Sequence, residues 1–194
     1  MRTCKALVIG GSAGSLNILF KFLPKLRHDL SFPIILVVHR KAGKEEMLTE
    51  LLASKTLLKV KEAQEKETLE PSVLYIAPPS YHLLVEKDLT LSLDASEKVN
   101  FSRPSIDVSF ESAADTFEEG LVALLLSGAN SDGTNGLKRV KEKGGITLIQ
   151  DPDSAQIPFM PQHASEHAPI DHVLKPELIA PFLNSLNDDS YGKI

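Results

Sequence analysis

Short apolar runs alternate with longer amphipathic stretches along most of the chain. Unbroken runs of this kind are typical of parallel strands that are buried on both faces. We expect such strands at residues 4–10, 33–39, 73–77, 121–128, 146–150 and 172–174. Apolar residues at helical spacing lie between these runs and predict helices at residues 15–24, 44–54, 104–120 and 134–143, after Pro161, and at 176–186.

The clearest helical pattern covers residues 104–120. Ser105 is placed to cap its start and Gly120 to end it, and its apolar face consists of Ile106, Phe110, Ala113, Ala114 and Phe117. The segment 44–54 shows the same spacing at Met47, Leu48, Leu51 and Leu52. The charged run at 61–67 is predicted to be a solvated surface segment.

Residues 82–93 carry a different pattern, because two apolar runs flank Lys87 and Asp88. This predicts an antiparallel hairpin. The other elements predict the α/β class: a doubly wound, mostly parallel sheet with helices on both faces and a small antiparallel hairpin. The sequence shows no repeat and no linker, so we expect a single domain over residues 1–186 and a polar tail at 187–194.

Composition narrows the class of protein further. The chain has 194 residues, of which 42% are hydrophobic, enough for a substantial core. The net charge of −5 gives no support for a nucleic-acid partner. Cys4 is the single cysteine, so no disulfide can form within the chain. The apolar runs are too short for a secretory signal or a membrane helix, which predicts a cytoplasmic protein without membrane insertion.

Three chemically capable side chains fall at or just after the ends of predicted strands. Ser12 follows the first strand, His39 ends the second, and Asp132 follows the strand at 121–128. Because ligands bind beyond the carboxyl ends of parallel strands, these three can meet at one edge of the sheet. A serine needs a base to take its proton, and that base needs an acceptor to hold its tautomer. Together they predict a nucleophile, a general base and an orienting acid.

The turn around Ser12 fits the G-x-S-x-G pattern of a nucleophile elbow, at residues 10–14. The chain order serine, histidine, aspartate differs from that of the α/β-hydrolases. Taken alone, the turn also suits a tight connection or an anion site, but it is neither a Walker A loop nor a G-x-G-x-x-G loop. His39 alone would pass for a strand-end histidine, and Asp132 for a turn or cap residue. Their combination favours a catalytic site.

Several longer motifs resemble the catalytic domain of the CheB family, the bacterial chemotaxis protein-glutamate methylesterases. The serine turn and the histidine strand are similar to this family's first two strand ends, and the matches continue in order over nearly the whole chain. The matching segments are VIGGSAGSL, ILVVHR, YIAPPSYHLLV, RPSIDVSFESAA, LLSGANSDGTNGLKRVKEKGG and QDPDSAQIPFMPQHA.

The resemblance implies that residues 1–186 form a methylesterase-type catalytic domain with Ser12 as nucleophile, His39 as general base and Asp132 as the residue that orients His39. It implies as substrates the glutamyl methyl esters on the cytoplasmic helices of chemoreceptors, with methanol released, and glutamines for members that also deamidate. Backbone amides at Ala13 and Ala129 would stabilise the oxyanion, and Met160 would shape the pocket wall. No metal or cofactor is needed.

The sequence departs from the family pattern beside the nucleophile. Ala13 stands where the family has threonine, and Ala129 stands where it has methionine. Many members also carry an N-terminal receiver domain, whereas this sequence begins at the catalytic part. The expected partners are therefore methylated receptor helices, together with a receiver domain or a kinase acting in trans.

Two other functions remain open at this point. A catalytically silent signalling or docking module would keep the same fold, and a phosphate-binding module would use the glycine-rich turn. Arg103 could steer acidic receptor side chains, although pairing with a nearby acid is the preferred interpretation. His163, Glu166 and His167 match H-x-x-E-H, but the flanking prolines leave a helix barely long enough for a zinc site. His82 is expected to be structural.

Overall fold

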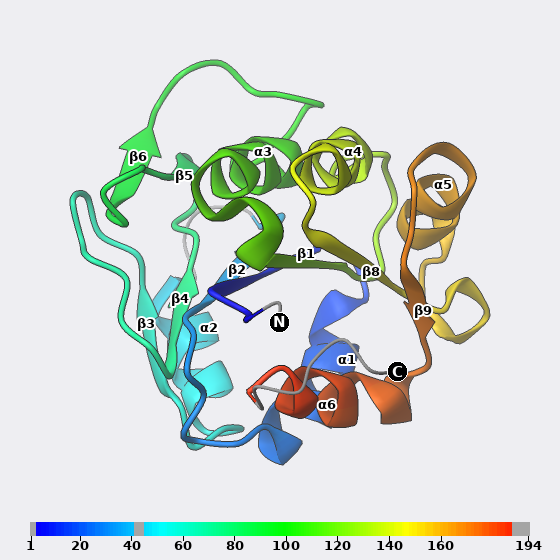
Figure 1. Cartoon of the computed structure of the whole chain (residues 1–194), viewed down its shortest axis with the longest axis horizontal. Helices are drawn as coiled ribbons and strands as arrows, with labels where there is room; N and C mark the ends of the chain where they lie inside the picture. Colours follow the sequence, from blue (N-terminus) through cyan, green and yellow to red (C-terminus); the bar gives the residue numbers. More distant parts are fainter. Residues whose placement is uncertain (1–2, 41–44, 188–194) are drawn as a thin grey trace.

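Seven parallel strands form the central sheet of the computed structural model, which describes residues 3–40 and 45–187 (Figure 1). The strand order is β3-β4-β2-β1-β7-β8-β9, and every neighbouring pair is parallel. The strands are β1 (Ala6–Gly11), β2 (Ile34–Val38), β3 (Lys59–Glu62), β4 (Val73–Ile76), β7 (Leu121–Leu125), β8 (Ile146–Gln150) and β9 (His172–Leu174). All residues of β1, β2, β4, β7 and β8 are buried, as their unbroken apolar runs predict.

Helices cover both faces of this sheet, which confirms the doubly wound α/β prediction (Figure 1). One face carries α3 (Ile106–Phe117), α4 (Thr134–Glu142) and α5 (Phe159–His167), and the other carries α1 (Ser15–Phe22), α2 (Glu45–Ala53) and α6 (Pro176–Ser185). Each face has its own apolar core. Short 3₁₀ turns follow α1, α3 and β8, at Leu23–Lys25, Glu118–Gly120 and Pro152–Ser154.

The predicted hairpin is present as a separate two-stranded antiparallel sheet. β5 (His82–Val85) pairs with β6 (Leu91–Asp94) in the register that places His82 opposite Asp94. The hairpin packs on α3, where the Ser112 hydroxyl accepts the N–H of Val85 at 3.1 Å. The loop that follows β6 returns to the carboxyl edge of the main sheet, where Asn100 donates to Asp132 and the Ser102 hydroxyl lies 3.4 Å from Nδ1 of His39.

One local prediction holds only in part. The charged run that begins at Lys61 is not purely a solvated surface segment, because residues 59–62 form β3, an edge strand paired with β4. The predicted helix at 44–54 is present as α2, in which Leu52 is buried while Met47 is 64% and Leu51 is 43% exposed. Edge strands commonly carry charges, since these discourage pairing with another chain.

The connections place a crevice at the centre of the sheet. The chain leaves β1 through α1 toward β2, and it leaves β7 through α4 toward β8 in the opposite direction. Because β1 and β7 are neighbours, their carboxyl ends form the topological switch point at which ligands bind in open α/β sheets. Ser12 directly follows β1 at this point.

Hydrogen bonds hold the C-terminal end of the described chain against the segment before β2. Asn187, the first residue of the expected tail, accepts the N–H of Ser31 at 2.6 Å and donates to the carbonyl of Asp29 at 3.2 Å. The rest of the expected tail, 188–194, lies outside the described residues, as does Lys44 at the expected start of α2. No helix in the described ranges combines the length and apolar character that crossing a bilayer requires.

Candidate active site

Ser12 lies in a tight turn between β1 and α1. Its N–H donates to the carbonyl of Ser127 at 2.9 Å, and its own carbonyl accepts the N–H of Ser15 at 3.0 Å. Gly14 adopts φ 83°, a left-handed conformation that L residues rarely adopt, and this conformation allows α1 to begin at the next residue. The serine side chain is half-buried and lies beside the first turn of α1.

Ser127, at the end of the neighbouring β7, stabilises this turn from behind. Its hydroxyl lies 2.8 Å from the carbonyl oxygen of Ala13 and accepts the N–H of Ile157 at 2.9 Å. Its own N–H donates to the Gln150 side chain at 3.1 Å. One buried hydroxyl therefore links the serine turn, β7 and the loop before α5. Sequence reasoning missed this residue, because its contacts join segments up to 114 positions apart.

Gly128 allows a close approach behind Ser12. A Cβ at this position would lie 2.5 Å from Met160 Cε and 3.0 Å from Ser12 Cβ. Met160 is fully buried, and its N–H donates to the Gly128 carbonyl at 3.0 Å. The predicted pocket-wall residue thus packs behind the serine turn and against Gly128.

His39 follows β2, and its backbone N–H donates to the Gly11 carbonyl at 3.1 Å. Its Nε2 lies 2.7 Å from Oδ2 of Asp132, and the imidazole is only 13% exposed. The structure therefore brings together two of the predicted residues, which lie 93 positions apart.

The Asp132 carboxylate is fully buried, and within the described residues five groups donate to it. Besides His39, they are the N–H groups of Ile106 and Asp107 at 2.8 and 3.1 Å, the Ser105 hydroxyl at 2.9 Å and the Asn100 amide at 3.2 Å. Burial acts to raise the pKa of Asp132, but the hydrogen bonds from His39 and these backbone amides outweigh it and hold the pKa below its usual value.

This arrangement selects one tautomer of the neutral imidazole. An ionised carboxylate only accepts hydrogen bonds, so Nε2 of His39 carries a hydrogen, and in the neutral imidazole Nδ1 then has the free lone pair. Asp132 also caps α3 from another part of the chain. Ser105 occupies the cap position, as predicted, but its hydroxyl makes no capping bond and donates to Asp132 instead.

A second buried carboxyl, Asp107, lies next to Asp132. It accepts the N–H of Gly136 near the start of α4 at 2.7 Å, and Asn100 donates to both carboxylates. Burial raises the pKa of Asp107 to about 6, and the negative charge of Asp132 acts in the same direction. Neither Asn100 nor Asp107 was singled out from the sequence as part of the site.

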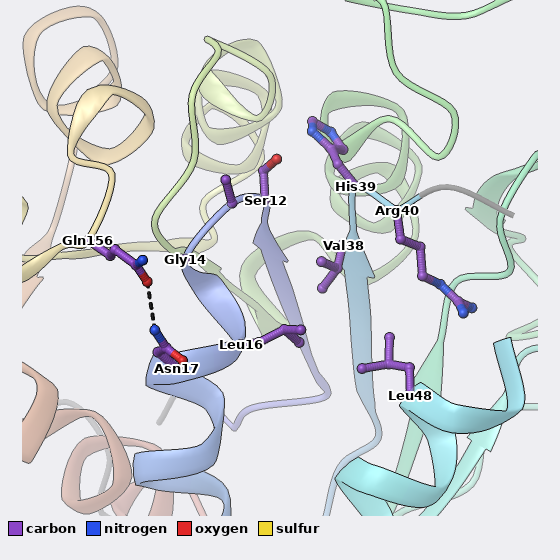
Figure 2. A pocket seen from close by; sticks show the side chains of 10 residues that line it. Ser12, Gly14, Leu16, Asn17, Val38, His39, Arg40, Leu48 and Gln156 are labelled. Atoms are coloured by element: carbon purple, nitrogen blue, oxygen red, sulfur yellow. Dashed lines mark hydrogen bonds between the residues drawn. The ribbon is translucent and has the colours of Figure 1, made fainter. Parts of the chain in front are cut away.

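Ser12 and His39 line the same pocket, of about 380 Å³, between α1, α2 and the end of β2. Figure 2 shows the Ser12 hydroxyl on the side of its turn that faces His39. Among the described residues no hydrogen bond joins these two side chains, and Nδ1 of His39 lies 3.4 Å from the hydroxyl of Ser102. Leu16, Val38 and Leu48 give the pocket an apolar side, and Gln156 bonds Asn17 at 2.6 Å across its rim.

The remaining candidates occupy distinct places. Ala13 lines the pocket, and Ala129 is exposed just after Gly128. In the described part of the chain, the backbone N–H groups of Ala13 and Ala129 have no hydrogen-bond partner. Arg103 makes no ion pair there, contrary to the preferred interpretation: its guanidinium donates to the carbonyls of Ala95 and Ser96, although its charge also helps to lower the pKa of Asp94.

The histidines outside the site have structural contacts. His82 is buried, and its Nδ1 accepts the N–H of Ser105 at 3.1 Å while Nε2 lies 2.9 Å from the Glu97 carbonyl. His163 stacks on His167 and bonds Thr134 at 3.0 Å. The described residues contain no cluster of three potential metal ligands.

A serine turn beside a buried histidine–carboxylate pair, at the switch point of a parallel sheet, is the arrangement of a serine hydrolase. The family model described as CheB methylesterase matches residues 7–183. The chain belongs to the CheB methylesterase family.

Proteins of this family are similar to the chain over most of its length. A Leptospira interrogans protein, provisionally named protein-glutamate methylesterase/protein-glutamine glutaminase, is 45% identical over 186 residues, or 96% of each chain. A Halalkalibacterium halodurans protein with that name is 38% identical over 177 residues, and the chain spans about half of its length. The crystal structure of the Thermotoga maritima CheB methylesterase catalytic domain superposes with a TM-score of 0.90 at 33% identity, covering 95% of this chain and 99% of that one.

Proposed function

We propose that this protein is a protein-glutamate methylesterase, with residues 1–186 as its catalytic domain. It hydrolyses glutamyl methyl esters on the cytoplasmic helices of chemoreceptors, and it also deamidates receptor glutamines. The observation that carries this proposal is the 2.7 Å contact between Nε2 of His39 and Asp132, together with the pocket that His39 and Ser12 both line. The site of action is the cytoplasm, and a receiver domain or a kinase acting in trans regulates it.

In the proposed reaction, Nδ1 of His39 takes the Ser12 proton as Oγ attacks the ester carbonyl. Here the carboxylate accepts from Nε2, whereas in the serine-protease triad it accepts from Nδ1, so the roles of the two ring nitrogens are exchanged. The Ser12–His39 bond need not be present in the free enzyme, since catalytic hydrogen bonds often tighten only when substrate binds.

The tetrahedral oxyanion is stabilised by the N–H groups of Ala13 and Ala129, whose hydrogen-bonding capacity is unused. His39 returns its proton to the leaving methoxide, which departs as methanol. Water then attacks the acyl-enzyme, His39 takes a proton from it, and Ser12 regains its hydrogen as the free glutamate is released. For a glutamine substrate the leaving group is ammonia.

A fluorophosphonate probe tests this function directly. It should label the wild-type protein at Ser12, and His39→Gln should lose the labelling together with methanol release from a methylated receptor. The alternative is a catalytically silent docking module, in which Ala13 and Ala129 mark a lost activity. That alternative predicts receptor binding without labelling and without methanol.

A further inference from the structure

A hollow of about 310 Å³ adjoins the serine pocket and shares His39 and Arg40 with it. Its other lining residues are Lys98, Phe101, Ser102 and Arg103. We refer to these six residues as the basic hollow. Three of them are cations and none is an acid, although the whole chain carries a net charge of −5.

The positive charge of the basic hollow is only partly compensated. Arg40 is paired with Glu62 at 2.6 Å, and its side chain points away from Ser12 (Figure 2). Lys98 is exposed and has no ion-pair partner in the described part of the chain. Arg103 bonds only carbonyl oxygens there, and its Nε is buried without a partner. The charge of Arg103 also acts on Asp94, but Asp94 does not line the hollow, so the side chains of Lys98 and Arg103 give its surface a positive charge beside His39.

An aromatic side chain lies at the mouth of the hollow. Phe101 is 97% exposed and has φ 62°, and the preceding Asn100 has φ 50°. Two successive non-glycine residues in the left-handed region are unfavourable and persist only where other contacts hold them. Asn100 supplies such contacts, because its side chain donates to Asp132 at 3.2 Å and to Asp107 at 2.8 Å. The turn thus exposes Phe101 to solvent, and the hydrogen bonds of Asn100 connect this turn to Asp132 in the active site.

We propose that the basic hollow, with Phe101 as its apolar anchor, is the docking surface for an acidic helix that carries the esterified glutamate. This inference rests on the proposed function, and it adds that the substrate helix carries acidic residues near the esterified glutamate. When the ester carbonyl lies at Ser12, the adjoining turn of its helix lies over the basic hollow, because both spaces meet at His39. Side chains three and four positions from the ester lie on the same helix face, so acidic residues there face Lys98 and Arg103.

Binding to a trapped enzyme tests the surface independently of catalysis. The probes are two synthetic two-stranded coiled coils with one central glutamyl γ-methyl ester, flanked three and four positions away by Glu in one and by Gln in the other. The protein carries Ser12→Ala so that the ester survives. We expect the Glu probe to bind about tenfold more tightly at low salt, with the difference shrinking as ionic strength rises.

Substitutions in the basic hollow then test whether its residues cause the tighter binding of the Glu probe. Lys98→Glu should remove the preference for the Glu probe, and Phe101→Ser should weaken binding of both probes about fivefold or more. The matched controls Lys25→Glu and Leu57→Ser change an exposed lysine and an exposed leucine outside the basic hollow, and they should leave both affinities unchanged.

Equal binding of the two probes, no binding of either, or a Lys98→Glu variant that behaves like Lys25→Glu would overturn the docking surface. If the wild-type protein binds the probes in the expected order but hydrolyses neither ester, the proposed esterase function fails while the docking surface stands.

Discussion

Nε2 of His39 lies 2.7 Å from a carboxylate oxygen of Asp132 that also accepts the first N–H of helix α3. The same group thus orients the imidazole and caps a helix whose apolar face is part of the core. The two roles draw on different donors and can be separated by substitution.

Asp132→Asn should lower both activity and stability. An amide cannot accept from all five surrounding donors, so we expect activity to fall about 10⁴-fold and the free energy of unfolding to fall by about 1–3 kcal/mol. Methanol release and urea denaturation measure the two effects. His39→Gln should abolish activity while leaving the helix-capping bonds in place. Equal losses of stability in the two variants would contradict the capping role.

Ser12→Ala should abolish methanol release from a methylated receptor, by about 10⁴-fold or more, because the variant lacks the hydroxyl that forms the acyl-enzyme in the proposed reaction. The free energy of unfolding should change little, since the Ser12 hydroxyl makes no hydrogen bond within the described residues. Ser165→Ala removes an exposed hydroxyl on α5 and serves as the matched control. If the Ser12 variant released methanol at the wild-type rate, Ser12 would not be the nucleophile.

Asp107 should make the fold less stable as the pH rises through about 6. Burial raises its folded-state pKa from 3.8 to about 6, so the folded state binds more protons than the unfolded state between these values. The contribution of Asp107 to stability is therefore most favourable below about pH 4, and it is lost as the pH rises through about 6, by up to about 3 kcal/mol.

Asp107→Asn tests this contribution, because the variant lacks the titrating group. The difference in unfolding free energy between wild type and variant should change across that pH window, as measured by urea denaturation at several pH values. Asp153→Asn removes an exposed carboxylate outside the site and should follow the wild type throughout. A pH-independent difference for Asp107→Asn would refute the shifted titration.

Gly128→Ala should disturb the nucleophile through Met160. The new Cβ would lie 2.5 Å from Met160 Cε and 3.0 Å from Ser12 Cβ, so the methionine must move or the serine turn must shift. We expect a loss of about 1–3 kcal/mol in stability and a lower rate of ester hydrolysis. In a double-mutant cycle, Gly128→Ala should lower the free energy of unfolding less when Met160 is also replaced by alanine. Simple additivity would show that the two sites do not interact.

The sheet, the helices and the hairpin could be predicted because their patterns are local. Burial on both faces leaves unbroken apolar runs, as at residues 121–125, which form β7. β3 escaped prediction because an edge strand needs few apolar residues, and Lys59–Glu62 contains only one, Val60. Met47 and Leu51 show the converse limit, since helical spacing does not reveal how far a partner surface extends.

Only the site residues that lie at or near the ends of strands could be predicted from the sequence. Ser12, His39 and Asp132 each lie at or near a strand end, so the fold class alone suggested their proximity. Asn100, Ser102 and Ser127 were missed, because their contacts depend on loops whose course no periodicity encodes. Arg103 was assigned the wrong kind of partner for the same reason.

The capping of α3 by Asp132 also affects how related sequences are interpreted. A descendant that had stopped hydrolysing esters would still gain stability from this carboxylate through the capping of α3. The presence of an aspartate at position 132 is therefore poor evidence that a relative is active. Position 12 is more informative, because its hydroxyl makes no hydrogen bond in the described part of the chain, so that its loss would cost the fold little once the reaction is no longer required.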